Sequence, residues 1–264
     1  MDVSAIWRTY GRHAAIVLRA GPAHTTTSSA GSFTAFSGAP HVDLNQAALF
    51  GPATAADATA IVDAATGRDI PVLLALSSTV RDPDALRAVL DAAGFRRAVR
   101  PEAFFHASQP PPPAASPFST RRVTRAADHA AMLAVFDAAH GYADDATRRM
   151  YGPALLDGLD VEAWLAWDGD EPISCVYVTR VGDSLGVFDM NTAPAHRRRG
   201  AGRAVLTAAL HAVATRLDRP PSVCFWSTPL GRPMYESIGF VVIDDVEVWT
   251  LGASDQDMDA VGAG

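Results

Sequence analysis

The sequence contains no lysine, only two cysteines and no long apolar run. The basic residues are therefore all arginine or histidine, which we attribute to genome composition rather than to function. Without a run of roughly 18 apolar residues, a membrane-spanning helix is not expected. Cys175 and Cys224 lie in apolar, strand-like stretches with no Cys-x-x-Cys pair and no metal-ligand spacing, so we predict buried, reduced thiols and no metal site.

Charge and length narrow the class of protein further. The net charge of −7 does not steer the chain toward nucleic acid, and we predict neither a nucleic-acid nor a membrane partner. Arg8, Arg12 and His13 interrupt the segment in which a secretion signal would need a continuous apolar stretch, so we expect a soluble, cytoplasmic protein. The 264 residues suffice for two modest domains, and a homodimer is left open.

The most informative stretch reads Pro-Ala-His-Arg-Arg-Arg-Gly-Ala-Gly-Arg-Ala-Val-Leu, from Pro194 to Leu206. The apolar run Leu185 to Met190 precedes it. Apolar residues then recur at spacings of 4, 3 and 4, which is the periodicity of one helix face. The pattern predicts that a strand ends and a helix begins at Gly200 and Gly202. The apolar residues of the helix are Leu206, Leu210, Val213 and Leu217.

Such a helix start can hold an anion. Its first backbone N–H groups have no partner within the helix and carry the positive end of the helix dipole. Gly200 and Gly202 lack a Cβ, so a phosphate can come close to the main chain, and Arg198, Arg199 and Arg203 add positive charge. We predict a pyrophosphate cradle, meaning residues 197–203 throughout, although the pattern alone also fits a solvated basic surface.

A second motif follows downstream. Pro233 to Phe240 reads Pro-Met-Tyr-Glu-Ser-Ile-Gly-Phe, which predicts a short helix closed by a glycine and followed by a strand. Together the two stretches resemble the GNAT acetyltransferase family. Its Arg/Gln-x-x-Gly-x-Gly/Ala pattern is matched by Arg197, Gly200 and Gly202, and its Leu-Tyr-Glu-x-x-Gly-Phe-like stretch is matched from Met234 to Phe240.

The resemblance implies an α/β (α+β) fold, with a mixed central sheet, two splayed strands and flanking helices. It also implies acetyl-CoA as co-substrate. Thr192 departs from the valine that is common at its position, and Thr228 stands where the family often has asparagine. The cofactor-binding residues carried over are Met190, Asn191 and Thr192 for the pantetheine arm, Arg197, Arg198, Arg199, Gly200, Ala201, Gly202 and Arg203 for the pyrophosphate, and Thr228 for the arm or the substrate.

The family's reaction is attack by an amine on the thioester carbonyl within a ternary complex. Tyr235 stands where the family has the tyrosine that protonates the departing thiolate, and the alternative is a packed aromatic side chain. The general base stays open between Asp189, His140 and a water chain. The acceptor is expected to be a small-molecule or peptide amine. A transferase of another acyl group, an acyl-CoA sensor without turnover, and an interaction protein stay open as alternatives.

The N-terminal half repeats the same order of elements. The offset from Pro52 to Pro194 is 142 residues and that from Phe95 to Phe240 is 145, which suggests an internal duplication, with coincidental alternation as the alternative. The first copy has neither the glycine pair nor the arginines, and Leu90 stands in the place of Tyr235. We therefore predict tandem GNAT-like domains, the first degenerate and without a cofactor site.

A proline-rich stretch, Gln109 to Pro117, is typical of an extended linker, and an SH3-type ligand is the alternative. It sets the predicted domains at residues 1–115 and 116–264. In the first we expect a helix over 3–19 interrupted near Gly11, a loop with one short strand over 21–38, strands over 41–50, 70–76 and 95–106, and helices over 55–65 and from Asp82 to Gly94. In the second we expect strands over 119–124, 161–167, 173–181, 185–190, 223–226 and 241–251 and helices over 127–138, 145–156, 202–217 and 229–238.

Overall fold

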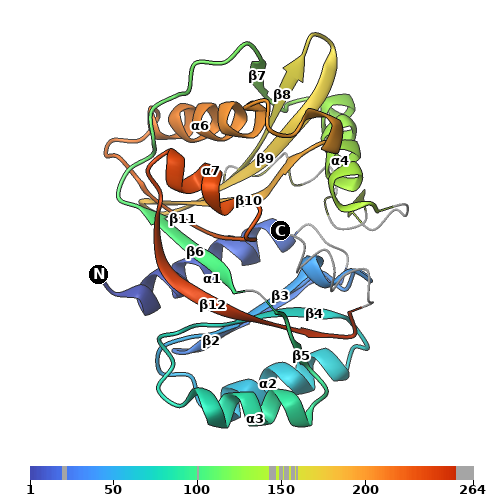
Figure 1. Ribbon diagram of the computed structural model, residues 1–264, viewed down its shortest axis with the longest axis vertical. Coiled ribbons are helices and arrows are strands. Elements are labelled where there is room, and N and C mark those ends of the chain that lie inside the picture. The colour runs from blue at the N-terminus through green and yellow to red at the C-terminus, as the bar shows by residue number, and fades with distance from the viewer. Residues whose placement is uncertain are drawn as a thin grey trace. The chain divides into compact units, whose positions relative to one another are not determined.

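The computed structural model describes residues 1–19, 23–99, 101–142, 147–148, 151, 155, 158 and 160–253 (Figure 1). By their contacts the residues divide into two compact units. The first contains Met1–Phe105 together with Trp226–Pro233 and the chain from Val242 onward. The second contains His106–Phe225 and Met234–Val241. Each unit contains parallel and antiparallel strand pairs with flanking helices, which confirms the predicted fold class.

In the first unit a mixed sheet runs in the order β1-β2-β3-β4-β12, and β5 also pairs with β12. Neighbouring strands are antiparallel except β3 and β4, which are parallel. The last strand of the chain therefore completes the sheet of the N-terminal half. The elements are α1 (Val3–Leu18), β1 (Thr25–Ser28), β2 (Ser32–Phe36), η1 (Val42–Leu44), β3 (Asn45–Leu49), α2 (Ala55–Thr66), β4 (Val72–Leu76), α3 (Pro83–Ala92), β5 (Arg96–Arg97), the first four residues of β6 (Glu102–Ala107), and β12 (Val241–Leu251).

Helices cover both faces of this sheet. Phe33 and Phe36 are three residues apart on β2, so they point to opposite faces. Phe33 lies against Trp7 of α1, with ring centroids 6.5 Å apart. Phe36 belongs to the core cluster that includes residues of α2 and α3, such as Ile61. Figure 1 accordingly shows α1 on one side of these strands and the pair α2 and α3 on the other.

Two predictions for this unit are wrong, and packing explains one of them. Helix α1 runs unbroken through Gly11, where a Cβ would lie only 2.9 Å from the ring of Phe33. The glycine is needed there because the helix comes close to β2. Residues 21–38, predicted as loop with one short strand, contain the hairpin β1–β2. Its turn is held by hydroxyl groups, with Ser29 Oγ 2.9 Å from Ser32 Oγ and 2.8 Å from Asp57 Oδ1.

Other boundaries differ only in detail. The strand predicted over 41–50 begins later, at Asn45, after the short turn η1, and the strand predicted over 95–106 is divided into β5 and β6. Helix α2 begins at a capping box formed by Thr54 and Asp57, and α3 begins after Asp82, whose carboxylate accepts from Ala85 N. Both helices confirm the predictions over 55–65 and from Asp82 to Gly94.

In the second unit the strand order is β7-β8-β9-β10-β11. All neighbours are antiparallel except the pair β10 and β11, which is parallel. Helices α4 and α6 pack against this sheet. The elements are β7 (Ser119–Arg122), α4 (Ala126–His140), β8 (Val161–Asp168), β9 (Glu171–Val181), β10 (Ser184–Thr192), η3 (Pro194–His196), α6 (Ala201–Ala214), the first four residues of β11 (Ser222–Ser227), and α7 (Arg232–Ser237) from Met234 onward.

The strand and helix order predicted for the C-terminal half is therefore confirmed for the residues that the structure describes. The turn Asp168-Gly169-Asp170 joins β8 and β9, and Gly169 has a positive φ of 61°. Most of the helix predicted over 145–156 lies outside the described residues, as does the tail from residue 254 onward. Residues 110–115, within the predicted linker, contain no helix or strand.

Candidate functional site

The site begins where two parallel strands part. The ladder between β10 and β11 consists of Ser184 with Ser222, Leu185 with Val223, and Gly186 with Cys224. Strand β10 continues from Val187 to Thr192 without a partner in β11. A strand edge that has no neighbouring strand can pair with another extended segment through its main-chain groups. This separation is the splay that the family resemblance predicts.

A β-bulge shapes the same stretch of β10. Phe188 pairs with Tyr177 and Asn191 with Cys175 on β9, so two residues, Asp189 and Met190, stand opposite one. Asp189 has a positive φ of 50°, which is unusual for a residue other than glycine.

The three residues predicted to bind the pantetheine arm, Met190, Asn191 and Thr192, follow at and after the bulge, and all three are half-buried. The side-chain nitrogen of Asn191 is buried and has no hydrogen-bond partner among the described residues. An acceptor from outside the chain would satisfy it.

The start of α6 is an open anion site. Gly200 is the N-cap in the left-handed conformation, with φ 88°, and no side chain caps the helix. The first turn contains no acidic residue, and nothing lies within 4 Å of the position that a Cβ of Gly200 would take. The first N–H groups of the helix therefore have no side-chain acceptor within the described residues, and the dipole favours an anion there.

The four arginines of the cradle have different partners. The guanidinium of Arg197 donates to two carbonyls, with Nη2 3.1 Å from Ala139 O and Nε 3.3 Å from Thr192 O. Arg199 forms an ion pair with Asp168, at 2.8 Å. Arg198 and Arg203 are exposed, and their guanidinium groups have no partner in the part of the chain that the structure describes. These two side chains are the ones available to a phosphate.

The two glycines of the cradle also serve different purposes. A Cβ on Gly202 would lie 2.7 Å from Met190 Cε and 3.2 Å from Thr192 Oγ1. The sequence interpretation gave Gly202 the task of letting a phosphate approach, but protein side chains fill that side. Gly202 allows α6 to pack against β10, whereas Gly200 allows the left-handed backbone at the start of the helix.

Tyr235, the predicted proton donor, is 5% exposed on α7. Its ring packs against Phe225, with centroids 4.6 Å apart, and against Phe240 at 6.2 Å. The environment fits a packed aromatic side chain and equally a donor in a covered site, so its catalytic role stays a prediction. Thr228 is exposed after β11 and belongs by its contacts to the first unit, so its role also stays a prediction.

The two candidate bases have defined surroundings. The Asp189 carboxylate accepts a hydrogen bond from the hydroxyl of Tyr151, a side chain that is 1% exposed. Tyr151 stacks on Tyr177, whose hydroxyl lies 2.9 Å from Nε2 of buried His129. Burial raises the pKa of Tyr151 well above its ordinary value, and the negative charge of Asp189 adds to this effect, so Tyr151 stays a neutral donor. His140 instead stacks on Phe136, at 4.5 Å.

The contact of Tyr151 with Asp189 was not predicted, and neither were its neighbours Tyr177 and His129. The three residues come from three separate segments, and Tyr151 stands out in the sequence only as an apolar position of an expected helix. No spacing in the chain connects them. The signal that could have drawn attention was Asp189 itself, a carboxylate in an otherwise apolar strand.

The corresponding place in the first unit is closed. Strands β3 and β4 stay paired as far as Leu49 with Leu76, and Ser77 N then donates to Leu49 O at 2.9 Å. The start of α2 holds its own anion, because Asp57 Oδ2 accepts from Thr54 N at 2.9 Å. Burial opposes ionisation of Asp57, but hydrogen bonds from Ser29, Thr54 and Ser32 hold its pKa below the ordinary value.

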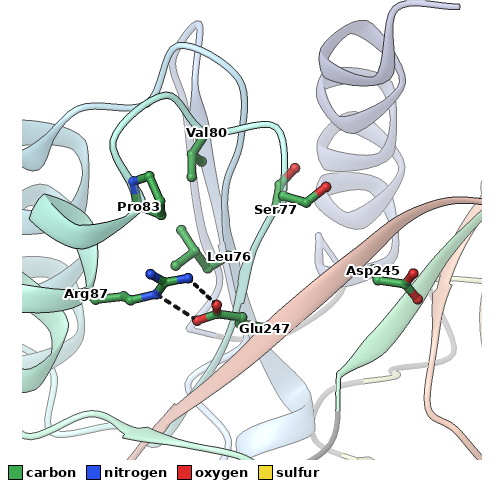
Figure 2. A pocket seen from close by; sticks show the side chains of 8 residues that line it. Leu76, Ser77, Val80, Pro83, Arg87, Asp245 and Glu247 are labelled. Atoms are coloured by element: carbon green, nitrogen blue, oxygen red, sulfur yellow. Dashed lines mark hydrogen bonds and ion pairs between the residues drawn. The ribbon is translucent and has the colours of Figure 1, made fainter.

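A pocket of about 230 Å³ lies in the first unit, near the start of α3 (Figure 2). Arg87 on its wall pairs with Glu247, with Nε 3.2 Å from Oε2, and with Asp84 at 2.7 Å. Asp245 pairs with Arg232 at 2.9 Å. The charged groups of its lining are thus already neutralised within the protein, and we assign it no ligand.

Comparison with known proteins agrees with this geometry. Residues 160–242 match the family model of the acetyltransferase (GNAT) domain. The chain carries a GNAT acetyltransferase domain. This match confirms the predicted family and enzyme class for the C-terminal half. None of the curated proteins matches the sequence.

Solved structures resemble the chain in fold. A GCN5-related N-acetyltransferase from Kribbella flavida is 17% identical, with 93% of this chain and 96% of that chain covered and a TM-score of 0.60. Another from Sphaerobacter thermophilus is 14% identical over 84% and 76%, with a TM-score of 0.59. A tandem GNAT protein from the clavulanic acid biosynthesis pathway is 16% identical over 91% and 87%, with a TM-score of 0.55. At these identities the likeness concerns the fold.

None of the described helices is both long enough and apolar enough to cross a membrane. The described residues contain no group of three or more His, Cys, Asp and Glu side chains arranged to hold a metal ion.

Proposed function

We propose that the GNAT domain transfers the acetyl group of acetyl-CoA to a primary amine, by direct attack in a ternary complex. The observation that carries the proposal is the start of α6. It has an open helix terminus beside Arg198 and Arg203, whose guanidinium groups have no partner among the described residues, whereas the start of α2 in the first unit is filled by Asp57. Helix α2 thus serves as an internal comparison, because its start needs no outside anion.

The cradle fits a pyrophosphate in charge and in geometry. Backbone N–H groups at a helix start and guanidinium groups both donate to phosphate oxygens, and such charge-assisted hydrogen bonds are the stronger ones. Arg197 and Arg199 support the site differently, because their guanidinium groups hold Ala139, Thr192 and Asp168. Their contribution to phosphate binding comes from their backbone amides and their charge.

The free edge of β10 fits the arm of the co-substrate. An extended chain of amide groups can add to an exposed strand edge through main-chain hydrogen bonds. Met190, Asn191 and Thr192 supply that edge, and the buried amide nitrogen of Asn191 lacks an acceptor among the described residues. Bound acetyl-CoA supplies the activated acetyl group.

The protein's part in the chemistry is orientation and proton transfer. A backbone N–H in the Met190–Thr192 stretch would stabilise negative charge on the thioester oxygen during attack. Tyr235 would give a proton to the departing thiolate, since a phenol can donate while it is neutral. The general base is left open, and Asp189 is already engaged by the hydroxyl of Tyr151.

Calorimetry with acetyl-CoA tests the cradle. Replacing Arg198 and Arg203 together by alanine should weaken binding by about 10²–10⁴-fold, since each lost charge-assisted hydrogen bond contributes about 1.5–3 kcal/mol. Arg219→Ala is the matched control, because this exposed arginine pairs with Asp183, away from the cradle. Unchanged affinity of the double variant would show that the phosphates bind elsewhere.

The same titration gives the stoichiometry. One acetyl-CoA per chain is expected, and two would overturn the assignment of the first unit as empty. Release of free thiol with a panel of primary amines then tests the reaction. Tight binding without turnover would select a sensor, and faster turnover with succinyl-CoA would select another acyl donor.

A further inference from the structure

The bulge in β10 contains an unusual residue at its left-handed position. Bulges that begin with a residue of positive φ ordinarily have glycine there. Here the residue is Asp189, with φ 50°. Aspartate tolerates this conformation better than most residues, but it does not favour it as glycine does. Other contacts must therefore hold the bulge.

Three side chains from two segments hold it. The hydroxyl of Tyr151 donates to the Asp189 carboxylate. From β9, the thiol of Cys175 lies 3.8 Å from Asp189 O, and Ser174 Oγ donates to Asn191 O at 2.7 Å. The Tyr151 bond is the one that fixes the side chain at the strained position, so it opposes relaxation of that residue.

Tyr151 is itself firmly placed. Its ring stacks on Tyr177 with centroids 4.9 Å apart and meets Phe136 of α4 edge-on at 5.9 Å. With 1% of its surface exposed it has little room to change rotamer. The hydroxyl can therefore transmit the position of this aromatic cluster to the bulge.

We infer that Tyr151 is a positioning residue for acetyl transfer, which acts through Asp189 to fix the bulge of β10. The inference rests on the proposed function, because its consequence concerns the backbone of Met190, Asn191 and Thr192. Met190 is part of the bulge, and Asn191 and Thr192 follow it on β10. A bulge that relaxes toward a regular strand shifts their N–H groups away from the thioester.

This role differs from that of a base. If Asp189 accepted the proton of the amine, its carboxylate would be required. If Asp189 serves only to hold the bulge through Tyr151, glycine can replace it, because glycine adopts a positive φ without help. The variant Asp189→Gly therefore separates the two roles.

The experiment uses the full chain with acetyl-CoA and an amine that gives turnover. Tyr151→Phe keeps the stacked ring and removes the hydroxyl. We expect kcat to fall by about 10–100-fold, as for a reacting group displaced by roughly 1 Å, with acetyl-CoA affinity changed by less than about threefold. Asp189→Gly should keep kcat within about fivefold of the wild type, and adding Tyr151→Phe to it should have no further effect. Tyr177→Phe is the matched control, since it removes a neighbouring buried hydroxyl that faces His129.

Two results would overturn the inference. One is wild-type kcat in Tyr151→Phe. The other is an inactive Asp189→Gly variant, which would make the carboxylate itself a reactant. Hydrogen exchange at the amides of Met190 and Asn191 supplies a measure independent of turnover, and Tyr151→Phe should speed it at least tenfold. If the wild type fails to bind acetyl-CoA, the proposed function fails, and exchange at these amides still decides whether Tyr151 holds the bulge.

Discussion

The substitution Glu102→Gln should make the protein more resistant to alkaline conditions. Glu102 lies on β6, 3% exposed. Burial raises its pKa from 4.5 to about 8, and the negative charge of Asp43 adds to the effect. The folded protein therefore binds this proton more tightly than the unfolded chain does. The stability that the proton contributes is complete below a pH of about 4.5 and is lost as the pH rises through about 8.

The size of the effect follows from these two values. Each pKa unit corresponds to about 1.4 kcal/mol. Between about pH 5 and pH 8 the unfolded chain is largely deprotonated at this group, while the folded protein keeps the proton until about half of it is lost at pH 8. The wild type should lose roughly 3 kcal/mol of unfolding free energy over this range through Glu102 alone. Glutamine resembles the protonated acid and does not ionise, so the variant should not show this loss.

The measurement is urea unfolding of both proteins at several pH values from about 5 to 8. The stability of the variant relative to the wild type should rise by roughly 3 kcal/mol across the series. Burial also lowers the pKa of His13 from 6.5 to about 3, which removes stability as the pH falls, but this contribution is common to both proteins and cancels in the difference. Asp91→Asn, at an exposed position on α3, is the control. A difference that does not change with pH would refute the reasoning.

Two further substitutions test the site. Gly202→Ala should lower the free energy of unfolding by less than about 1 kcal/mol, because the flexible end of Met190 can move. Gly202→Val should lower it by about 1–3 kcal/mol, because the larger side chain overpacks against Met190 and Thr192. Thermal unfolding measures both, and equal stability of the two variants would contradict this packing. Tyr235→Phe keeps the ring packed against Phe225 and Phe240 and removes only the hydroxyl. It should lower kcat by roughly 10²–10⁴-fold and keep the affinity for acetyl-CoA. A wild-type kcat, with the chemical step shown to be rate-limiting, would leave Tyr235 as a packing residue.

Local signals in the sequence predicted most of the secondary structure. Helix α3 begins at Pro83, directly after its N-cap Asp82, and Gly94 follows its end with φ 83°. The turn at Gly169 joins β8 and β9, which lie over the two strands predicted there. These features depend on residues that are near one another in the chain, because capping and turn formation are short-range interactions.

The sequence by itself also determined the family and the position of the helix start at which we propose the cradle. Gly200 and the arginines around it stand next to one another in the chain, and the helix start that they form is a local structure. The sequence also shows that the predicted first copy lacks such residues. The structure adds a reason why no outside anion is needed there, because Asp57 fills the start of α2.

Only the tertiary structure decided the rest. It brought Tyr151 next to Asp189 and Met190 next to Gly202. It also placed the guanidinium groups of Arg197 and Arg199 where they bind other protein groups, and it paired β12 with β4. Each of these contacts joins residues that lie apart in the sequence. The partner of such a side chain depends on how strands and helices pack, and no periodicity or local spacing encodes that packing.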